Sequence, residues 1–139
     1  MIKKYPITSQ ISGRLPLVEA YLSRRKDVVF AYLFGSFATG KVHPLSDVDI
    51  AVYLDGLDIS EKRLEILGHL AGIFKTDEID LVVLNTAPLT LKMKILQFRR
   101  VISDNQPFKR HIYESITTRN YIDFSMLEMR MLERRFLHG

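Results

Sequence analysis

Apolar residues along the chain recur at helical spacing in its N-terminal half, where they predict two helices. The first follows Pro16, which a first helical turn tolerates, and ends near Arg24. Its apolar positions are Leu15, Val18, Tyr21 and Leu22. Ser60 can cap the second helix. The apolar positions expected on one side of that helix are Leu64, Leu67, Leu70, Ala71 and Phe74.

Three runs of β-branched and aromatic residues predict buried strands. They cover residues 28–34, residues 50–54 and residues 79–84. The first run is apolar at every position and is closed by Gly35, which indicates a strand that is buried on both faces. The order of helix, strand, strand, helix and strand predicts an α/β domain. We expect a mixed sheet of three to four strands flanked by helices.

The C-terminal part of the chain is expected to be mostly helical. Residues 88–98 fit an amphipathic helix, and Val101 and Ile102 fit a short edge strand. Residues 108–137 read as helix with a break near residues 117–120. A helical segment of about 105–139 therefore closes a single domain that spans residues 1–139.

Composition narrows the class of protein without naming a function. Of the 139 residues, 47% are hydrophobic and 26% are charged, as in ordinary globular domains. The absence of cysteine excludes disulfide scaffolds, thiolate metal sites and cysteine nucleophiles. No apolar run approaches the length of about 20 residues that a membrane-spanning helix needs, and no signal peptide is evident at the start. We expect a cytoplasmic protein that does not bind membranes.

Charge is distributed unevenly along the chain. Residues 1–89 carry 10 Lys and Arg against 11 Asp and Glu, whereas residues 90–139 carry 10 against 5. A basic segment of this kind attracts nucleic acid, a phosphorylated ligand or an acidic partner. The alternative is a solvated helix surface rich in arginine. Direct binding of RNA stays open and is not favoured.

Three aspartates stand beside apolar strand runs, where a carboxylate is costly unless something charged binds it. Asp47 and Asp49 are two residues apart, so their side chains point to one face of a strand and can hold a hard cation. Ten residues separate Asp47 from Ser36, which follows Gly35 at the end of the preceding strand. A loop of this length returns the chain to its starting edge. We therefore expect the two strands to be antiparallel, with Gly35 and Ser36 beside the carboxylates.

Asp80 joins this group through the topology of the chain. A helix of about fifteen residues links the second and third strands, and such a crossover joins parallel strands, so Asp80 should lie close to Asp49. Three carboxylates can surround one or two Mg²⁺ ions, with substrate phosphate as the remaining ligand. Gly35 allows the backbone to approach a ligand, and Ser36 can offer its hydroxyl and its N–H to phosphate. The pattern predicts metal-dependent phosphoryl or nucleotidyl transfer.

Three short motifs resemble those of the nucleotidyltransferase fold of the DNA polymerase beta superfamily. They are Leu33-Phe34-Gly35-Ser36, Asp47-Val48-Asp49-Ile50-Ala51-Val52 and Asp80-Leu81-Val82. The chain is similar in length to minimal nucleotidyltransferases, and residues 119–124 resemble the C-terminal helix of the antitoxins among them. The resemblance implies that Asp47 and Asp49 bind Mg²⁺ and that Asp80 completes the site and helps to activate the attacking hydroxyl. It also implies that Gly35 and Ser36 hold the triphosphate of ATP.

The same resemblance implies a partner. In that family a helical ribonuclease toxin of the HEPN class is silenced when the antitoxin transfers AMP from ATP to a toxin tyrosine. It therefore implies a protein adenylyltransferase that forms a hetero-oligomer with its toxin through the C-terminal helical segment. The chain departs from many relatives in the connecting loop, where Gly40 is followed by Lys41 instead of being preceded by arginine. Lys41 is the candidate substitute cation at the phosphates, although its position and geometry are not equivalent.

Each candidate also has an ordinary structural explanation. Asp47 fits a turn after Ser46, Gly35 and Ser36 fit a tight turn, and Asp80 fits a loop acid with Glu78 as its rival on the same strand face. The histidines at positions 43, 69 and 111 are left out of the site. Tyr113 and Tyr121 are expected to pack in the core or at an interface. The methionines Met126, Met129 and Met131 are expected to fill the core, with a partner-binding surface as the alternative.

Two other functions stay open on the sequence alone. One is a nucleotidyltransferase that acts on a small molecule, such as an aminoglycoside, or on an RNA 3′ end. The other is a non-catalytic antitoxin that neutralises its toxin by contact. Loss of the carboxylates separates these functions, because contact alone does not need them.

Overall fold

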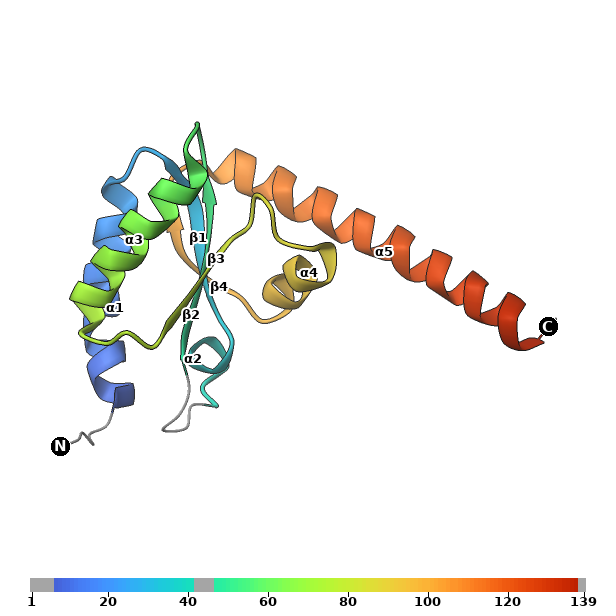
Figure 1. Ribbon diagram of the computed structural model, residues 1–139, viewed down its shortest axis with the longest axis horizontal. Helices are drawn as coiled ribbons and strands as arrows, with labels where there is room; N and C mark the ends of the chain where they lie inside the picture. The colour runs from blue at the N-terminus through green and yellow to red at the C-terminus, as the bar shows by residue number, and fades with distance from the viewer. Residues whose placement is uncertain (1–6, 42–46, 138–139) are drawn as a thin grey trace.

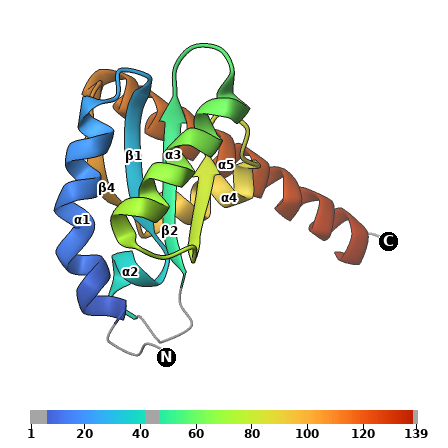
Figure 2. The ribbon, with the colours of Figure 1, turned by 60° about the vertical axis from the view of Figure 1, so that its left-hand side comes forward.

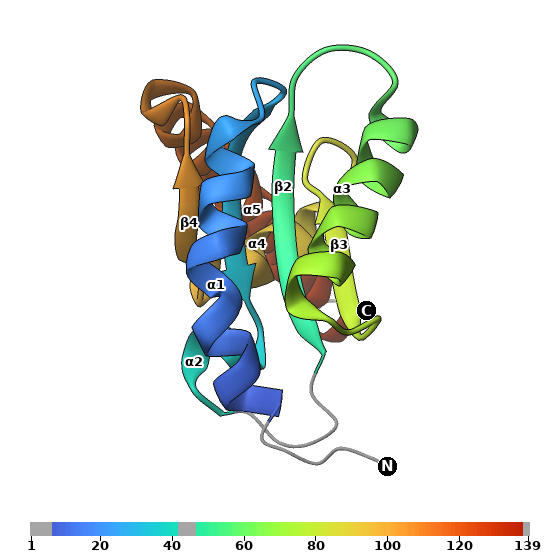
Figure 3. The ribbon, with the colours of Figure 1, turned by 90° about the vertical axis from the view of Figure 1, so that its left-hand side faces the viewer.

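A mixed sheet of four strands separates two layers of helices (Figure 1). This computed structural model describes residues 7–41 and 47–137. The elements in chain order are α1 (Ile7–Arg24), β1 (Val28–Phe34), α2 (Ser36–Thr39), β2 (Val48–Leu54), α3 (Ile59–Phe74), β3 (Ile79–Val83), α4 (Leu89–Gln97), β4 (Arg100–Asp104) and α5 (Pro107–Leu137). Helices α1 and α3 cover one face of the sheet, and α4 and α5 lie on the other (Figure 3). The expected α/β fold is confirmed.

The strand order is β3-β2-β1-β4. Strand β1 is antiparallel to β2 and to β4, whereas β2 and β3 are parallel. The predicted antiparallel return from β1 to β2 and the predicted parallel crossover from β2 to β3 are both confirmed. The short run at Val101 and Ile102 forms part of β4 at the sheet edge, as expected.

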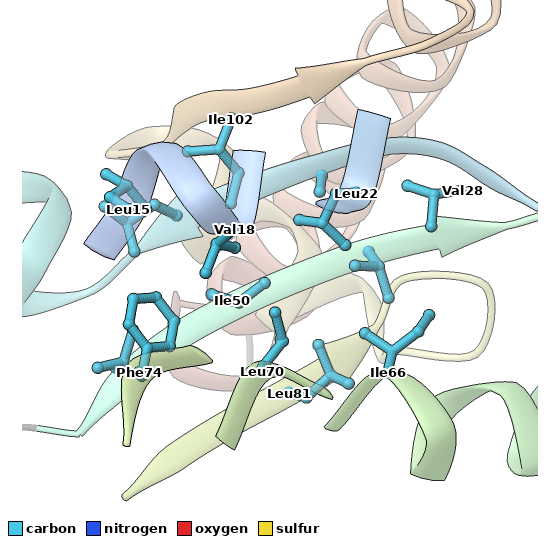
Figure 4. Packing of buried hydrophobic residues seen from close by; sticks show 14 of the residues in the cluster. Leu15, Val18, Leu22, Val28, Ile50, Ile66, Leu70, Phe74, Leu81 and Ile102 are labelled. Atoms are coloured by element: carbon cyan, nitrogen blue, oxygen red, sulfur yellow. The ribbon is translucent and has the colours of Figure 1, made fainter. Parts of the chain in front are cut away.

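Strand β1 is buried on both faces, as its unbroken apolar run predicts. Val28, Ala31 and Leu33 pack on the side of α1 and α3, whereas Phe30 and Tyr32 pack on the side of α4. An irregularity in the pairing with β2 between Val28 and Phe30 accommodates the change of side near the start of the strand. Figure 4 shows how side chains of α1 and α3 meet those of β2 and β3 in the first of these layers.

Helix α1 begins earlier than predicted, at Ile7, so Pro16 lies in its interior and not in its first turn. The buried stripe of the helix extends back to Ile11, four residues before Leu15, and this longer apolar face extends the helix. Proline leaves the carbonyl of Ser12 without its helical partner. Because Pro16 and Ser12 are both exposed, water can satisfy that carbonyl.

The predicted start of α3 is wrong, and its predicted apolar face is confirmed at Leu70 and Phe74 but wrong at Leu64. The residue before the helix is Asp58, in a left-handed conformation with φ 57°, and Ser60 lies inside the first turn. The buried stripe consists of Ile66, Leu70 and Phe74. Leu64 is 64% exposed because it lies about 200° around the helix from Ile66.

Helix α5 is continuous, so the predicted break near residues 117–120 is wrong. Neither glycine nor proline follows Pro107 within the helix, and Thr117 is buried against the body of the protein. Tyr113 packs on Phe30 and Tyr53, as expected. The methionines at positions 126, 129 and 131 are exposed, so the prediction that they fill the core is wrong. In the described part of the chain no helix is long and apolar enough to cross a membrane.

Candidate active site

The register of the sheet brings the candidate residues together at one end of its strands. Phe34 at the end of β1 is paired with Asp49 near the start of β2, so Gly35 follows directly beside that carboxylate. In the parallel pair, Asp49 is in turn opposite Asp80. Helix α2 lies at this end of the sheet, where β1 ends and β2 and β3 begin (Figure 2). Three segments far apart in the sequence therefore meet at one place.

Gly35 occupies a position that only glycine fits. Its φ of 70° and ψ of −151° belong to a region that L-residues with side chains avoid. A Cβ atom built on Gly35 would collide with the carboxylate oxygen of Asp49 and lie 3.0 Å from its Cγ atom. The Asp49 carboxylate fills the space that a side chain at position 35 would need.

Ser36 opens the short helix α2 beside this carboxylate. The turn is tight, since the N–H groups of Ala38 and Thr39 both donate to the carbonyl of Gly35, at 3.1 and 3.2 Å. The first N–H groups of a helical turn have no partner within the helix, and Gly35 at the N-cap has no side chain that could cap them. The half-buried Ser36 adds a hydroxyl to the same place. Hydroxyl and N–H donors of this kind suit an anionic ligand.

Burial and neighbouring acidic groups act together on Asp49. Burial first, and then the charges of Asp80 and Asp47, raise the pKa of Asp49 to about 6. The cation of Lys94 on α4 acts in the opposite direction. Like charges repel one another here, and a bound cation would relieve that repulsion.

The three aspartates are of the residue type that binds hard metal ions, although their side chains do not converge on one point. Within residues 7–41 and 47–137, no three side chains of the metal-ligating types form a group that could hold an ion. Asp47 and Asp80 are exposed, whereas Asp49 is half-buried. Carboxylate oxygens are the ligands that Mg²⁺ takes, together with substrate phosphate. The chemistry of these donors and their common edge therefore fit Mg²⁺.

The remaining candidates fall outside this cluster or beside it. Lys41 is exposed just after α2. Glu78 is also exposed, and its carbonyl accepts a hydrogen bond of 3.0 Å from the N–H of Val48. His69 stacks on Tyr21, away from the edge. His43 and Ser46 lie outside the described residues.

Sequence reasoning missed Lys94. It belongs to an amphipathic helix whose predicted bounds were nearly right, but no motif marks it. Only the packing of α4 on the sheet brings its charge near Asp49. A lysine on the polar side of a helix that follows the third strand is the weak signal that the sequence offers.

Residues 17–108 of the chain match the family described as polymerase beta, nucleotidyltransferase. The chain belongs to this family. The match covers β1, α2, β2 and β3 and so contains all the candidate residues named above. No curated protein matches the chain in sequence.

Solved structures of toxin–antitoxin complexes resemble this nucleotidyltransferase fold. A chain of a toxin–antitoxin structure with AMP-PNP superposes with a TM-score of 0.65 and 24% identity, over 91% of this chain and 95% of that one. A chain from the complex of tri-AMPylated Shewanella oneidensis HEPN toxin with MNT antitoxin gives a TM-score of 0.63 and 23% identity, over 86% and 96%. A chain of an MntA–HepT complex gives 0.58 and 22%, over 91% and 94%. At these identities the likeness establishes the fold.

Proposed function

We propose that this nucleotidyltransferase is the antitoxin of a toxin–antitoxin pair, and that it transfers AMP from ATP to a tyrosine of a helical HEPN ribonuclease toxin in the cytoplasm. One observation carries the proposal. Gly35, Asp49 and Asp80 meet at one sheet edge in a polymerase beta family member. The likeness to chains in toxin–antitoxin crystals adds support, since one contains AMP-PNP and another contains a tri-AMPylated toxin.

Asp47, Asp49 and Asp80 would hold Mg²⁺ in this reaction. The ion supplies positive charge that neutralises the triphosphate and polarises the reacting oxygens. Ser36 and the first N–H groups of α2 bind phosphate oxygens, and Lys94 adds a cation from the other side of Asp49. Lys41 stays a second candidate for that role. Positioning and electrostatics then account for most of the catalysis.

The transfer step forms one bond and breaks one. The tyrosine oxygen attacks the α-phosphorus of ATP, and the bond to the β-phosphate breaks so that pyrophosphate leaves. The carboxylate of Asp80 accepts the phenolic proton. Asp80 and Asp47 are exposed, so an acceptor as large as a protein can reach them.

Intact-mass analysis of the partner tests this proposal. The helical protein encoded by the neighbouring gene is incubated with this protein, ATP and Mg²⁺. We expect a mass gain of whole AMP units that disappears with Asp47→Asn. The matched control is Asp77→Asn, an exposed aspartate in the loop before β3, which should transfer normally. A stable complex without any mass gain would refute AMP transfer.

Neutralisation by contact alone is the second candidate, because the C-terminal half of α5 exposes many large apolar side chains. Growth rescue in cells separates the two functions. If Asp47→Asn still rescues growth while AMP transfer is lost, contact is sufficient. If rescue disappears although the complex forms, the chemistry is required.

A further inference from the structure

The last part of α5 extends beyond the sheet and its covering helices. Figures 1 and 2 show no other element beside it. Between residues 122 and 136 this segment exposes eight large apolar side chains, from 38% at Phe124 to 73% at Phe136. The other six are Ile122, Met126, Leu127, Met129, Met131 and Leu132. Apolar exposure of this density on one helical segment marks an interaction surface.

Seven of these side chains form two rows, and the eighth, Met126, lies about 40° around the helix from Ile122 at the border of the second row. The first row, Phe124, Leu127 and Met131, has the alternating spacing of three and four residues that is typical of helix–helix contacts. The second row has the same spacing, with Ser125 at its one polar position. Its members are Ile122, Ser125, Met129, Leu132 and Phe136. At about 100° per residue the two rows lie about 150° apart around the helix.

A single partner helix covers one row and leaves the other in water. The eight side chains expose on the order of 100 Å² each, so together they approach the area of about 800 Å² that one side of a stable interface buries. Burying all of them requires helices on two sides. We propose that residues 122–136 dock between two helices of a helical protein partner, each row packing against one of them.

Charge decides the class of partner. Residues 122–136 carry three acids, Asp123, Glu128 and Glu133, and three arginines, at positions 130, 134 and 135. A segment without net charge is unsuited to nucleic acid or to an anionic membrane surface, both of which select lysine and arginine. Within residues 7–41 and 47–137, a second copy of this chain offers one helix that extends past the sheet, and this helix would cover one row. A different protein with at least two adjacent helices fits both rows.

The base of α5 is held rigidly, so a docked partner takes a defined place. Glu114 accepts hydrogen bonds from the Tyr32 hydroxyl at 2.5 Å, from Arg99 Nε at 2.9 Å and from Arg110 Nη1 at 3.1 Å. Arg110 also donates to both carboxylate oxygens of Asp104 on β4. These contacts tie the helix to β1, to β4 and to the residue before β4. The inference rests on the proposed function only in taking the docked partner to be the AMP acceptor.

Matched aspartate substitutions test the two rows separately. Leu127→Asp removes an anchor of the first row, and Met129→Asp removes one of the second. Arg130→Asp, on the polar side next to them, is the control. Affinity for the helical protein encoded by the neighbouring gene is measured by titration calorimetry, and AMP transfer by intact mass. We expect each row variant to bind at least about 10-fold more weakly, and the control to stay within about 3-fold.

The outcomes distinguish this inference from the proposed function. Loss of binding in only one row variant would overturn docking between two helices, as would unchanged binding in both or no binding by the unaltered chain. A free chain that is dimeric in light scattering, and monomeric in one of the row variants, would identify a second copy as the occupant of that row. Binding that depends on both rows, without any AMP transfer, would leave the docking mode intact and refute the transferase proposal.

Discussion

Replacing Gly35 by alanine tests the geometry on which the candidate site depends. The substitution adds one methyl group at a point where the Asp49 carboxylate already lies, 3.0 Å from its Cγ and 3.3 Å from its Cβ atom. It also forces a residue with a side chain into φ 70° and ψ −151°. Both effects act on the same pair of adjacent strands, so either the backbone or the carboxylate has to move.

The two effects have different magnitudes. The backbone conformation alone costs about 2 kcal/mol of folding free energy. Displacing the carboxylate by about 1 Å costs on the order of 100-fold in reaction rate, because transfer depends on the placement of the reacting groups. Gly35→Ala should therefore be folded and moderately destabilised, but almost inactive in transfer.

Urea unfolding and the intact-mass assay measure these two quantities side by side. The matched control is Gly56→Ala, which also has a positive φ, of 91°, but lies at the opposite end of β2 and meets only the flexible end of Lys62. It should lose about 1 kcal/mol of stability and keep its activity. A Gly35→Ala protein with normal transfer would show that the contact between Gly35 and Asp49 does not define the site.

Two further substitutions probe the groups around the sheet. Burial raises the pKa of Glu114, but hydrogen bonds from Tyr32 and Arg110 outweigh burial, so the pKa of Glu114 is lowered in the folded protein. The ionised carboxylate therefore stabilises the fold at pH values above the ordinary pKa of a carboxyl group. This stabilisation is lost as the pH falls through the lowered pKa. Glu114→Gln should cost about 2 kcal/mol in urea unfolding at pH 7, and the difference should shrink below about pH 4; a constant difference would contradict this. Lys94→Ala should weaken binding of an ATP analogue about 10-fold in calorimetry. The control is Lys92→Ala, which should not weaken binding, because the ammonium of Lys92 lies over the ring of Tyr113. Equal losses in the two variants would show that Lys94 is not part of the site.

The sequence by itself determined most of the local elements and predicted the residues of the candidate site. Strand β1 follows from an unbroken apolar run, because a strand covered on both faces has no polar side. The return of the chain between Ser36 and Asp47 and the crossover before Asp80 are topological constraints, and they were enough to predict which strands pair and in which direction. They act through chain length and connectivity and do not depend on packing.

Tertiary structure decided the features that depend on contacts between the helices and the sheet. In α3 the sequence offers two overlapping apolar faces, and only contact with the sheet selects Ile66 over Leu64. In α5 the sequence reading placed a break near Thr117, but Thr117 is buried against the body of the protein and the helix runs through it. Lys94 acts on Asp49 only because α4 crosses the sheet beside it. The methionines of α5 looked like core residues, and their exposure depends on how far the helix extends past the sheet, which spacing along the chain does not encode.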